Sequence, residues 1–186
     1  MSGTHFRSIA LVLASAAISA ASLRAQQANP TEYQVKAAYL YNFGRFVEWP
    51  PKVAAGEFFS VCVLGQDPFG VTLDKTIAGE DINGKKAAVR RIARLQDAAL
   101  CRILFISLAE ENHLKEILAA LAGMSVLTVS DIPQFAQRGG MIQFVMRENK
   151  VRFEVNLTTA ERDGLTMSSQ LLKVAVNVRR SSQPGD

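Results

Sequence analysis

The chain has 186 residues, of which 48% are hydrophobic and 20% are charged. This composition excludes a disordered or fibrous chain, and the length suits one globular domain. The formal net charge is +4, but the first 25 residues hold Arg7 and Arg24 and no acid, so the remainder carries 19 basic and 17 acidic residues. That balance is too even to indicate binding to the phosphate backbone of a nucleic acid.

Residues 1–25 have the layout of a secretory signal peptide. A short basic start precedes the apolar run from Ile9 to Ile18, and small residues follow up to Ala25. The run has about half of the roughly 20 residues that a membrane-spanning helix needs, so cleavage after Ala25 is favoured over an uncleaved anchor. We therefore expect an exported, soluble protein.

A helix is predicted to begin at Thr31, which serves as its N-cap, and to end before Pro50-Pro51. Apolar residues at helical spacing form a core-facing stripe of Val35, Tyr39, Phe43, Phe46 and Val47. Tyr41 falls on the opposite side of this helix. It is either an ordinary surface aromatic or a contact for a partner, and both interpretations stay open.

Strands and helices then alternate along the chain. Strands are predicted at residues 58–64, 87–92, 103–106 and 126–129, and helices at residues 67–77, 110–121 and 131–139. Asp67 and Asp131 are the expected N-caps of two of these helices. The alternation predicts a mostly parallel central sheet flanked by helices.

The C-terminal part departs from this alternation. Residues 141–146 and 151–155 flank a polar turn and predict a hairpin attached antiparallel to the sheet, with Arg152 and Glu154 on its outward side. A helical turn is expected at residues 158–163. A last helix, at residues 168–178, carries an apolar arc wide enough to need a second surface, which is either a neighbouring helix or a dimer or partner interface. The prediction is a single three-layer α/β domain over residues 31–178, followed by a flexible tail at residues 179–186.

No constellation of catalytic or metal-binding residues can be assembled from the sequence. His113 is the only histidine after the signal peptide, and it lies among charged residues that are typical of a solvated helix. Neither a close cysteine pair nor an acidic loop cluster indicates a metal site, and no Gly-x-Ser-x-Gly motif occurs. The spacing from Gly65 to Gly70 resembles a phosphate loop, but Val71 stands where that motif needs lysine. We predict no enzymatic activity and no cofactor.

Cys62 and Cys101 are the only cysteines. An exported protein meets an oxidising compartment, where an even pair usually bonds. Because both cysteines lie in or beside predicted strands, neighbouring strands could hold them at bridging distance. The alternative is two buried thiols packed as small hydrophobic side chains.

Several segments resemble the YfiR family of small periplasmic proteins. They are YQVKAAYLYNFGRFVEWP, VCVLGQDPFG, CRILFIS, VLTVSDIPQFAQRGGMIQFV and VRFEVNLTTAERDGLTMSSQLLKVA. The resemblance implies an α/β fold, no enzymatic activity, a homodimer and a protein partner at the membrane, which in the best-known member is the periplasmic sensor domain of a diguanylate cyclase. Cys62 and Cys101 match a cysteine pair of the family, whereas a second pair of the repressor has no counterpart here.

Candidate binding residues come from two arguments. Crevices of open α/β sheets form beyond the carboxyl ends of the strands, where this chain has Gly65, Gln66, Asp67, Pro68, Phe69, Ser130 and Asp131. Exposed or outward side chains elsewhere add Tyr41, Arg138, Arg152, Glu154, Leu172 and Val176. The loops are equally explained as capped turns without a ligand, and Arg152 and Glu154 as a salt-bridged strand face.

These observations favour a non-enzymatic periplasmic regulator that restrains a membrane-bound signalling protein, with a diguanylate cyclase first among the partners that the resemblance implies. The alternative is a periplasmic small-molecule binding component of a sensor kinase or receptor system. A stable complex with a sensor domain is expected from the first, and a saturable ligand that raises thermal stability from the second.

Overall fold

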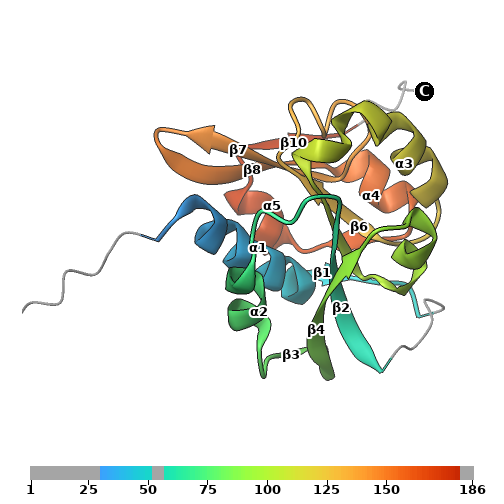
Figure 1. Cartoon of the computed structure of the whole chain (residues 1–186). Coiled ribbons are helices and arrows are strands. Elements are labelled where there is room, and N and C mark those ends of the chain that lie inside the picture. The colour runs from blue at the N-terminus through green and yellow to red at the C-terminus, as the bar shows by residue number, and fades with distance from the viewer. Residues whose placement is uncertain (1–29, 52–56, 181–186) are drawn as a thin grey trace, which may run out of the picture.

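A mostly parallel sheet organises the chain (Figure 1). The computed structural model describes residues 30–51 and 57–180, so the predicted signal peptide lies outside the described residues. The eight strands follow the order β10-β8-β7-β6-β5-β2-β4-β3. Their bounds are β2 (Phe58–Leu64), β3 (Asp81–Ile82), β4 (Lys85–Ile92), β5 (Ile103–Ile106), β6 (Leu127–Ser130), β7 (Ile142–Arg147), β8 (Lys150–Asn156) and β10 (Asn177–Arg179).

The central strands β4, β2, β5, β6 and β7 run parallel, while β3 and β8 are antiparallel to β4 and β7. The predicted α/β fold is therefore confirmed. The hairpin is confirmed as well, with one correction, because its first arm joins the sheet parallel to β6. Its turn residues Glu148 and Asn149 both have positive φ, as a two-residue hairpin turn of type I′ requires.

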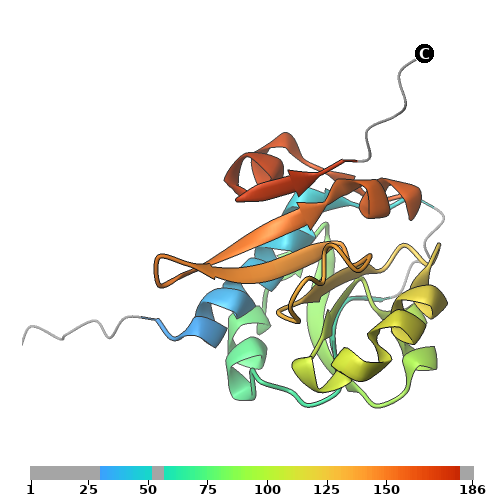
Figure 2. The ribbon, with the colours of Figure 1, turned by 90° about the horizontal axis from the view of Figure 1, so that it is seen from above.

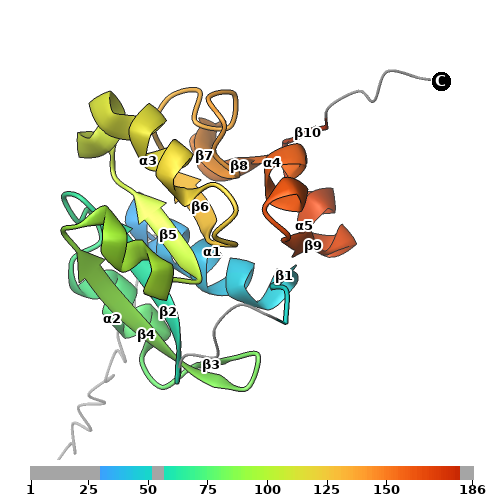
Figure 3. The same ribbon diagram turned by 90° about the vertical axis from the view of Figure 1, so that its right-hand side faces the viewer.

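Helices cover both faces of the sheet (Figures 2 and 3). One face packs against α1 (Glu32–Phe46) and α2 (Val71–Ile77), whose buried side chains belong to the larger core cluster. The other face packs against the 3-10 helix η1 (Leu95–Leu100) and α3 (Leu114–Leu121), which continues the 3-10 helix η2 (Leu108–His113). Two short helices, α4 (Leu157–Arg162) and α5 (Ser169–Val174), add Leu157, Ala160 and Leu171 to the larger cluster.

Helix α1 begins as predicted but buries a different stripe. Thr31 forms a capping box with Gln34. The buried residues are Lys36, Ala37, Leu40, Phe43 and Gly44, whereas the predicted Val35, Tyr39 and Phe46 are half-buried and Val47 lies beyond the helix in β1 (Val47–Glu48). Ala37 and Gly44 explain the difference, since small residues let α1 approach the sheet closely. A Cβ atom on Gly44 would lie 3.0 Å from Ile82.

Three predicted helices need correction. Helix α2 begins at Val71, with Gly70 as its N-cap, because Asp67 instead accepts a hydrogen bond from the Phe69 N–H in a tight turn. Residues 131–140 form turns and no helix. Helix α5 ends at Val174, and the chain then extends into β10, which pairs parallel with β8. The apolar arc predicted for a longer helix therefore does not exist, and Arg179, predicted to be in the tail, belongs to a strand.

The disulfide between Cys62 and Cys101 is confirmed, with a Cα–Cα distance of 5.8 Å. Cys62 lies in the middle of β2, and Cys101 comes just before the neighbouring strand β5. The bond lies among the buried residues of the smaller core cluster, beneath η1. It links two adjacent strands inside the core and reaches none of the candidate binding residues.

Removing this bond with the pair Cys62→Ala and Cys101→Ala is expected to lower the free energy of unfolding by about 2 to 4 kcal/mol. The bond closes a loop with a sequence separation of 39, and opening it gives the unfolded chain more conformational freedom. Denaturant unfolding of both proteins measures the difference. Labelling of two free thiols per native chain from exported protein would contradict the bond itself.

Candidate functional site

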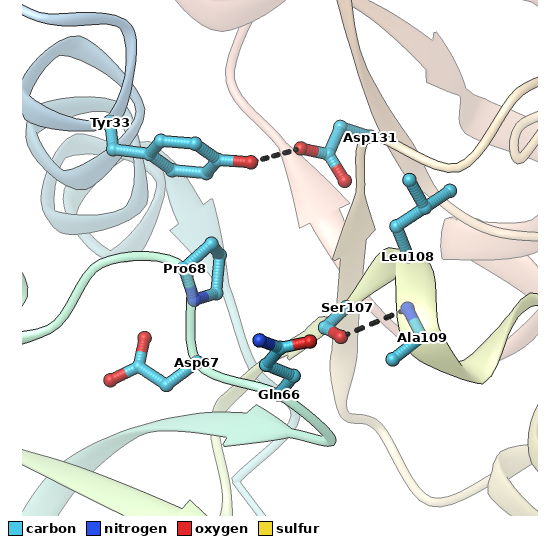
Figure 4. A pocket seen from close by; sticks show the side chains of 8 residues that line it. All are labelled: Tyr33, Gln66, Asp67, Pro68, Ser107, Leu108, Ala109 and Asp131. Carbon is cyan, nitrogen blue, oxygen red and sulfur yellow. Dashed lines mark hydrogen bonds between the residues drawn. The ribbon is translucent and has the colours of Figure 1, made fainter.

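The carboxyl ends of three neighbouring strands bring the candidate site together. Leu64, Ile106 and Ser130 are aligned across β2, β5 and β6, so the residues after them meet at one edge of the sheet. A pocket of about 250 Å³ opens there (Figure 4). Its lining residues are Tyr33, Gln66, Asp67, Pro68, Ser107, Leu108, Ala109 and Asp131. We call this cavity the strand-end pocket.

The Asp131 carboxylate joins this pocket to α1. Its Oδ2 accepts hydrogen bonds from the Lys36 ammonium (2.7 Å) and from the Tyr33 hydroxyl (3.2 Å), which reaches across from α1 (Figure 4). No described residue is bonded to its Oδ1. Lys36 also contacts Glu32, one helical turn earlier, and lies over the Tyr33 ring at 4.5 Å from the ring centroid. The cluster fastens the first half of α1 to the end of β6.

Burial and charge shift the ionisation of both α1 side chains. Burial raises the pKa of Tyr33, and the nearby Asp131 charge raises it further. Burial alone would lower the pKa of Lys36, but its hydrogen bonds to Asp131 and Glu32 outweigh this effect and raise it. Lys36 is therefore a cation at neutral pH although its side chain is only 3% exposed.

Asp67, on the opposite side of the pocket, uses both carboxylate oxygens in hydrogen bonds within the protein. One of its oxygens accepts from the Phe69 N–H (2.8 Å), and the other accepts from Arg91 Nε (2.9 Å). Arg91 also binds Asp74 and lowers the pKa of that carboxyl group. The lining groups with unused hydrogen-bonding capacity include the Gln66 amide and the second oxygen of Asp131. Both suit a small polar ligand better than they suit proton transfer or nucleophilic attack.

The strand-end pocket continues into a longer groove. A hollow of about 400 Å³ shares Leu108 and Asp131 with it, and a further hollow of about 620 Å³ shares Glu32 and Met146 with the second. Together the three run between the first half of α1 and the β7–β8 hairpin. The far end is lined by Lys150 and Arg152. We call the three hollows the α1 groove.

The predicted strand-end residues fall into two groups. Gln66, Asp67, Pro68 and Asp131 line the strand-end pocket. Phe69 and Ser130 lie behind it: Phe69 is buried edge-on against Tyr33 and Phe105, and the buried Ser130 hydroxyl donates to the Ile106 carbonyl. Gly65 supports the turn, because its φ is +84° and a Cβ atom there would lie 2.7 Å from Glu110.

The remaining predicted residues do not form one site. Arg152 lines the α1 groove. Glu154, which was predicted to be outward, is instead buried, 3.6 Å from Arg147, at a position of β8 that has a paired strand on each side, β7 and β10. Arg138 is bonded to Glu111 of η2, and the Tyr41 hydroxyl donates to Glu80 (2.7 Å). The two apolar candidates lie near the last strand, with Leu172 half-buried and Val176 45% exposed.

Sequence reasoning missed four lining residues of the pocket, namely Tyr33, Ser107, Leu108 and Ala109. The last three follow β5, so the argument from strand ends that selected Gln66 and Asp131 would have found them if it had been applied to every strand. Ser107 also accepts a hydrogen bond from the Ala109 N–H (Figure 4). Tyr33 does not follow a strand, so the sequence gives no sign of its place in the pocket. Only the packing of α1 against the sheet brings it there.

The described ranges hold neither a metal-binding cluster nor a membrane-spanning helix. Within residues 30–51 and 57–180, no group of three or more His, Cys, Asp or Glu side chains lies close enough together to hold a metal ion. No helix in the same ranges has the length and apolar content to cross a membrane.

Two solved structures are similar to part of this chain. One, of a conserved domain protein from Vibrio cholerae, has a TM-score of 0.48 at 13% identity over 64% of this chain. The other, an ABC domain in complex with L-Trp from Streptococcus pneumoniae, has a TM-score of 0.52 at 9% identity over 77% of this chain. This chain spans only 54% and 60% of those two chains. Identities this low concern the fold alone.

A match to a protein family covers most of the chain. The sequence profile described as YfiR/HmsC-like matches residues 33–176, from the first helix to the residue before β10. This range includes every strand of the sheet except β10, both cysteines of the disulfide and all the lining residues of the strand-end pocket. The chain therefore belongs to the YfiR/HmsC-like family.

Proposed function

We propose that the protein is a non-enzymatic periplasmic regulator that restrains a membrane-bound diguanylate cyclase by binding the periplasmic sensor domain of that enzyme. The observation that carries this proposal is membership of the YfiR/HmsC-like family over residues 33–176. The strand-end pocket supports the non-enzymatic part of this proposal, because its carboxylates Asp131 and Asp67 are paired with Lys36 and Arg91. The signal-peptide layout of residues 1–25 supports export.

The α1 groove is the surface that we propose for the sensor domain. It is long, it is lined by both apolar and charged side chains, and Leu108 (56%) and Met146 (47%) are exposed along it. Exposed apolar residues with a charged rim are typical of protein-binding surfaces. We also expect a homodimer, for which Val174 and Val176, both exposed beside the edge strand β10, offer an apolar contact.

Deleting the gene is expected to raise cyclic di-GMP and promote surface attachment, and restoring it should reverse both changes. The cause is release of the cyclase from its repressor. The measurement is the cellular content of cyclic di-GMP under conditions in which the cyclase is expressed. An unchanged content in the deletion strain would exclude this function.

Restoring the gene with single substitutions then tests the groove. Arg152→Glu reverses a half-exposed charge in the groove and is expected to change stability by no more than about 0.5 kcal/mol. The matched control is Lys115→Glu, the same charge reversal on an exposed residue of α3 at the other sheet face. Repression lost with the first variant and kept with the second, at equal protein levels, supports the groove as the contact.

A second candidate function is binding of a small molecule in the strand-end pocket. It is favoured by the Gln66 amide and the second oxygen of Asp131, which line a cavity of about 250 Å³ and have no bonded partner among the described residues. A ligand there would stabilise the folded state by RT ln(1 + [L]/Kd), so the melting temperature would rise with the logarithm of the ligand concentration once that concentration exceeds the Kd. Screening polar metabolites by thermal shift, with Gln66→Ala as the control, distinguishes this function from the first.

A further inference from the structure

Within the part of the chain that the structure describes, one corner of the sheet lacks the cover that a parallel sheet normally has. In the parallel pair of β2 and β4, Phe58 is aligned with Lys86 and Cys62 with Arg90. Aligned residues of paired strands point to the same side, and residues four apart in one strand do so too. Phe58, Lys86 and Arg90 therefore face the side of the sheet on which the Cys62 disulfide is buried.

The described helices cover one part of this face of the sheet and leave the other part uncovered. Cys62, Leu64 and Ile92 are buried beneath η1 and α3. Phe58, at the start of β2, is 46% exposed, and Lys86 and Arg90 are exposed on β4. In Figure 3 no helix lies in front of the start of β4. Parallel strands are almost always covered on both faces, so an open face carrying a phenylalanine calls for a partner.

The sequence around this corner is rich in basic residues. Residues 85–102 contain six basic residues and one acid, Asp97, which leaves 13 basic and 16 acidic residues in the rest of the predicted mature chain. One of the six, Arg91, points to the other face of the sheet, where it is paired with Asp67 and Asp74. Arg90 has no ion-pair partner among the described residues. Lys86 pairs with Asp81 and Arg94 with Asp97, but these pairs are exposed and therefore weak in water.

A second large exposed apolar side chain lies just before β5, the strand that pairs with β2 on the side opposite β4. Leu100, the last residue of η1, is 58% exposed and directly precedes Cys101, which the disulfide holds against β2. An acidic protein surface would pair with the cations but would not bury the apolar side chains of Phe58 and Leu100. The head-group region of a bilayer takes up cations together with exposed aromatic and aliphatic side chains.

We propose that this corner, defined by Phe58, Lys86, Arg90 and Leu100, rests on the head groups of an anionic lipid membrane. The contact goes beyond the proposed function, because it needs no cyclase. It would hold the regulator at the membrane surface, where the sensor domain of a membrane protein is within reach, while the α1 groove, on the other face of the sheet, stays open.

Sedimentation of the purified exported protein with vesicles tests this proposal. We expect binding to vesicles of phosphatidylethanolamine with phosphatidylglycerol and little binding to phosphatidylcholine alone. Raising the salt from about 10 to 150 mM should weaken binding, since it shortens the Debye length from about 30 to about 8 Å. Arg90→Glu should lower the partition coefficient at least about tenfold, because it changes two charges at the bilayer surface.

The matched control is Lys173→Glu, which makes the same change in net charge on exposed α5, away from this corner. It should leave binding within about twofold of the unmodified protein. Phe58→Ser with Leu100→Ser should remove the binding that remains at high salt, since it deletes the apolar part of the contact.

Three results would overturn the proposal. The first is no binding of the unmodified protein to the anionic vesicles, and the second is equal losses for Arg90→Glu and Lys173→Glu, which would show that only net charge matters. The third is that Arg90→Glu impairs binding to the sensor domain while vesicle binding stays absent, which would assign the corner to an acidic protein. No cyclase is present in the vesicle assay, so its result leaves the proposed repression to be judged separately.

Discussion

Replacing Phe43 with alanine is expected to lower the free energy of unfolding by about 3 to 5 kcal/mol. Phe43 is fully buried at the centre of the α1 face of the sheet. Its ring lies 5.1 Å from that of Phe153 in an edge-on arrangement, and it stacks with Phe144 at 5.9 Å and with Tyr39 at 5.8 Å. The substitution removes the ring from all three contacts and leaves a cavity that α1 cannot close without moving.

Phe58→Ala provides the matched control, because it makes the same chemical change at a ring that is 46% exposed. Its expected cost is below about 1 kcal/mol. Denaturant unfolding of both variants measures the difference. Similar losses for the two would show that Phe43 does not hold α1 on the sheet. In cells, Phe43→Ala should reduce repression through a lower amount of folded protein, in contrast to Arg152→Glu, which is expected to leave that amount unchanged.

Local patterns in the sequence predict most of the sheet. The run at residues 58–64 is almost continuously apolar because both faces of β2 are covered along most of its length. The polar turn before Val151 marks the hairpin, and Glu148 and Asn149 adopt the left-handed conformation there. These features depend on neighbours within a few residues, so one sequence is enough to reveal them.

Elements that depend on distant partners are not predictable in this way. Strand β10 has only three residues and exists because β8 offers its edge, while the apolar spacing of residues 171–178 equally fits a helix. Residues 131–140 carry helix-like signals in Asp131 and Pro133, but the Ser130 hydroxyl accepts a hydrogen bond from the Ile132 N–H and turns the chain instead. In the first case a tertiary contact overrides the helix preference. In the second a local turn does so, at a hydroxyl that is held by its bond to the Ile106 carbonyl.

The residues of the candidate site likewise include some that local sequence patterns predict and some that depend on distant contacts. Gln66 and Asp131 are predictable, because parallel strands bring their carboxyl ends to one edge. Lys36 is not, since a lysine at helical spacing reads as a solvated side chain until Asp131, 95 residues away, is known to lie beside it. The register of α1 depends on that ion pair and on the small residues Ala37 and Gly44, so the predicted stripe was displaced.

Removing the Asp131 carboxylate is expected to destabilise the protein far more than removing Glu32, although both groups bond to the same lysine nitrogen. Glu32 makes the shorter contact, at 2.5 Å against 2.7 Å for Asp131. Its side chain is 44% exposed, however, whereas that of Asp131 is 18% exposed, so water screens the Glu32 pair much more strongly. Burial, and not distance, decides which pair matters.

Asp131→Ala should lower the free energy of unfolding by about 3 kcal/mol, because it leaves a nearly buried ammonium with one exposed partner. Glu32→Ala should cost no more than about 0.5 kcal/mol. Equal losses for the two, measured by denaturant unfolding at neutral pH, would contradict this ranking.

The pH dependence of stability gives a second measurement of the same cluster. The pKa of Lys36 is raised in the folded state, so the folded state holds this proton more tightly than the unfolded chain does. Its contribution to stability is therefore fully present below the ordinary lysine pKa of 10.5 and is lost as the pH rises above that value. Tyr33, whose pKa is raised from 10.0, acts in the same direction.

Tyr33→Phe separates these two groups, since it removes the titrating hydroxyl and keeps the ring beside Lys36. This variant should still lose stability between about pH 10 and 12, and Lys36→Met combined with Tyr33→Phe should lose less over the same range. If the double variant loses as much stability as Tyr33→Phe alone, then Lys36 does not fasten α1 to β6 through its charge. The link between the first helix and the floor of the strand-end pocket would then depend on packing alone.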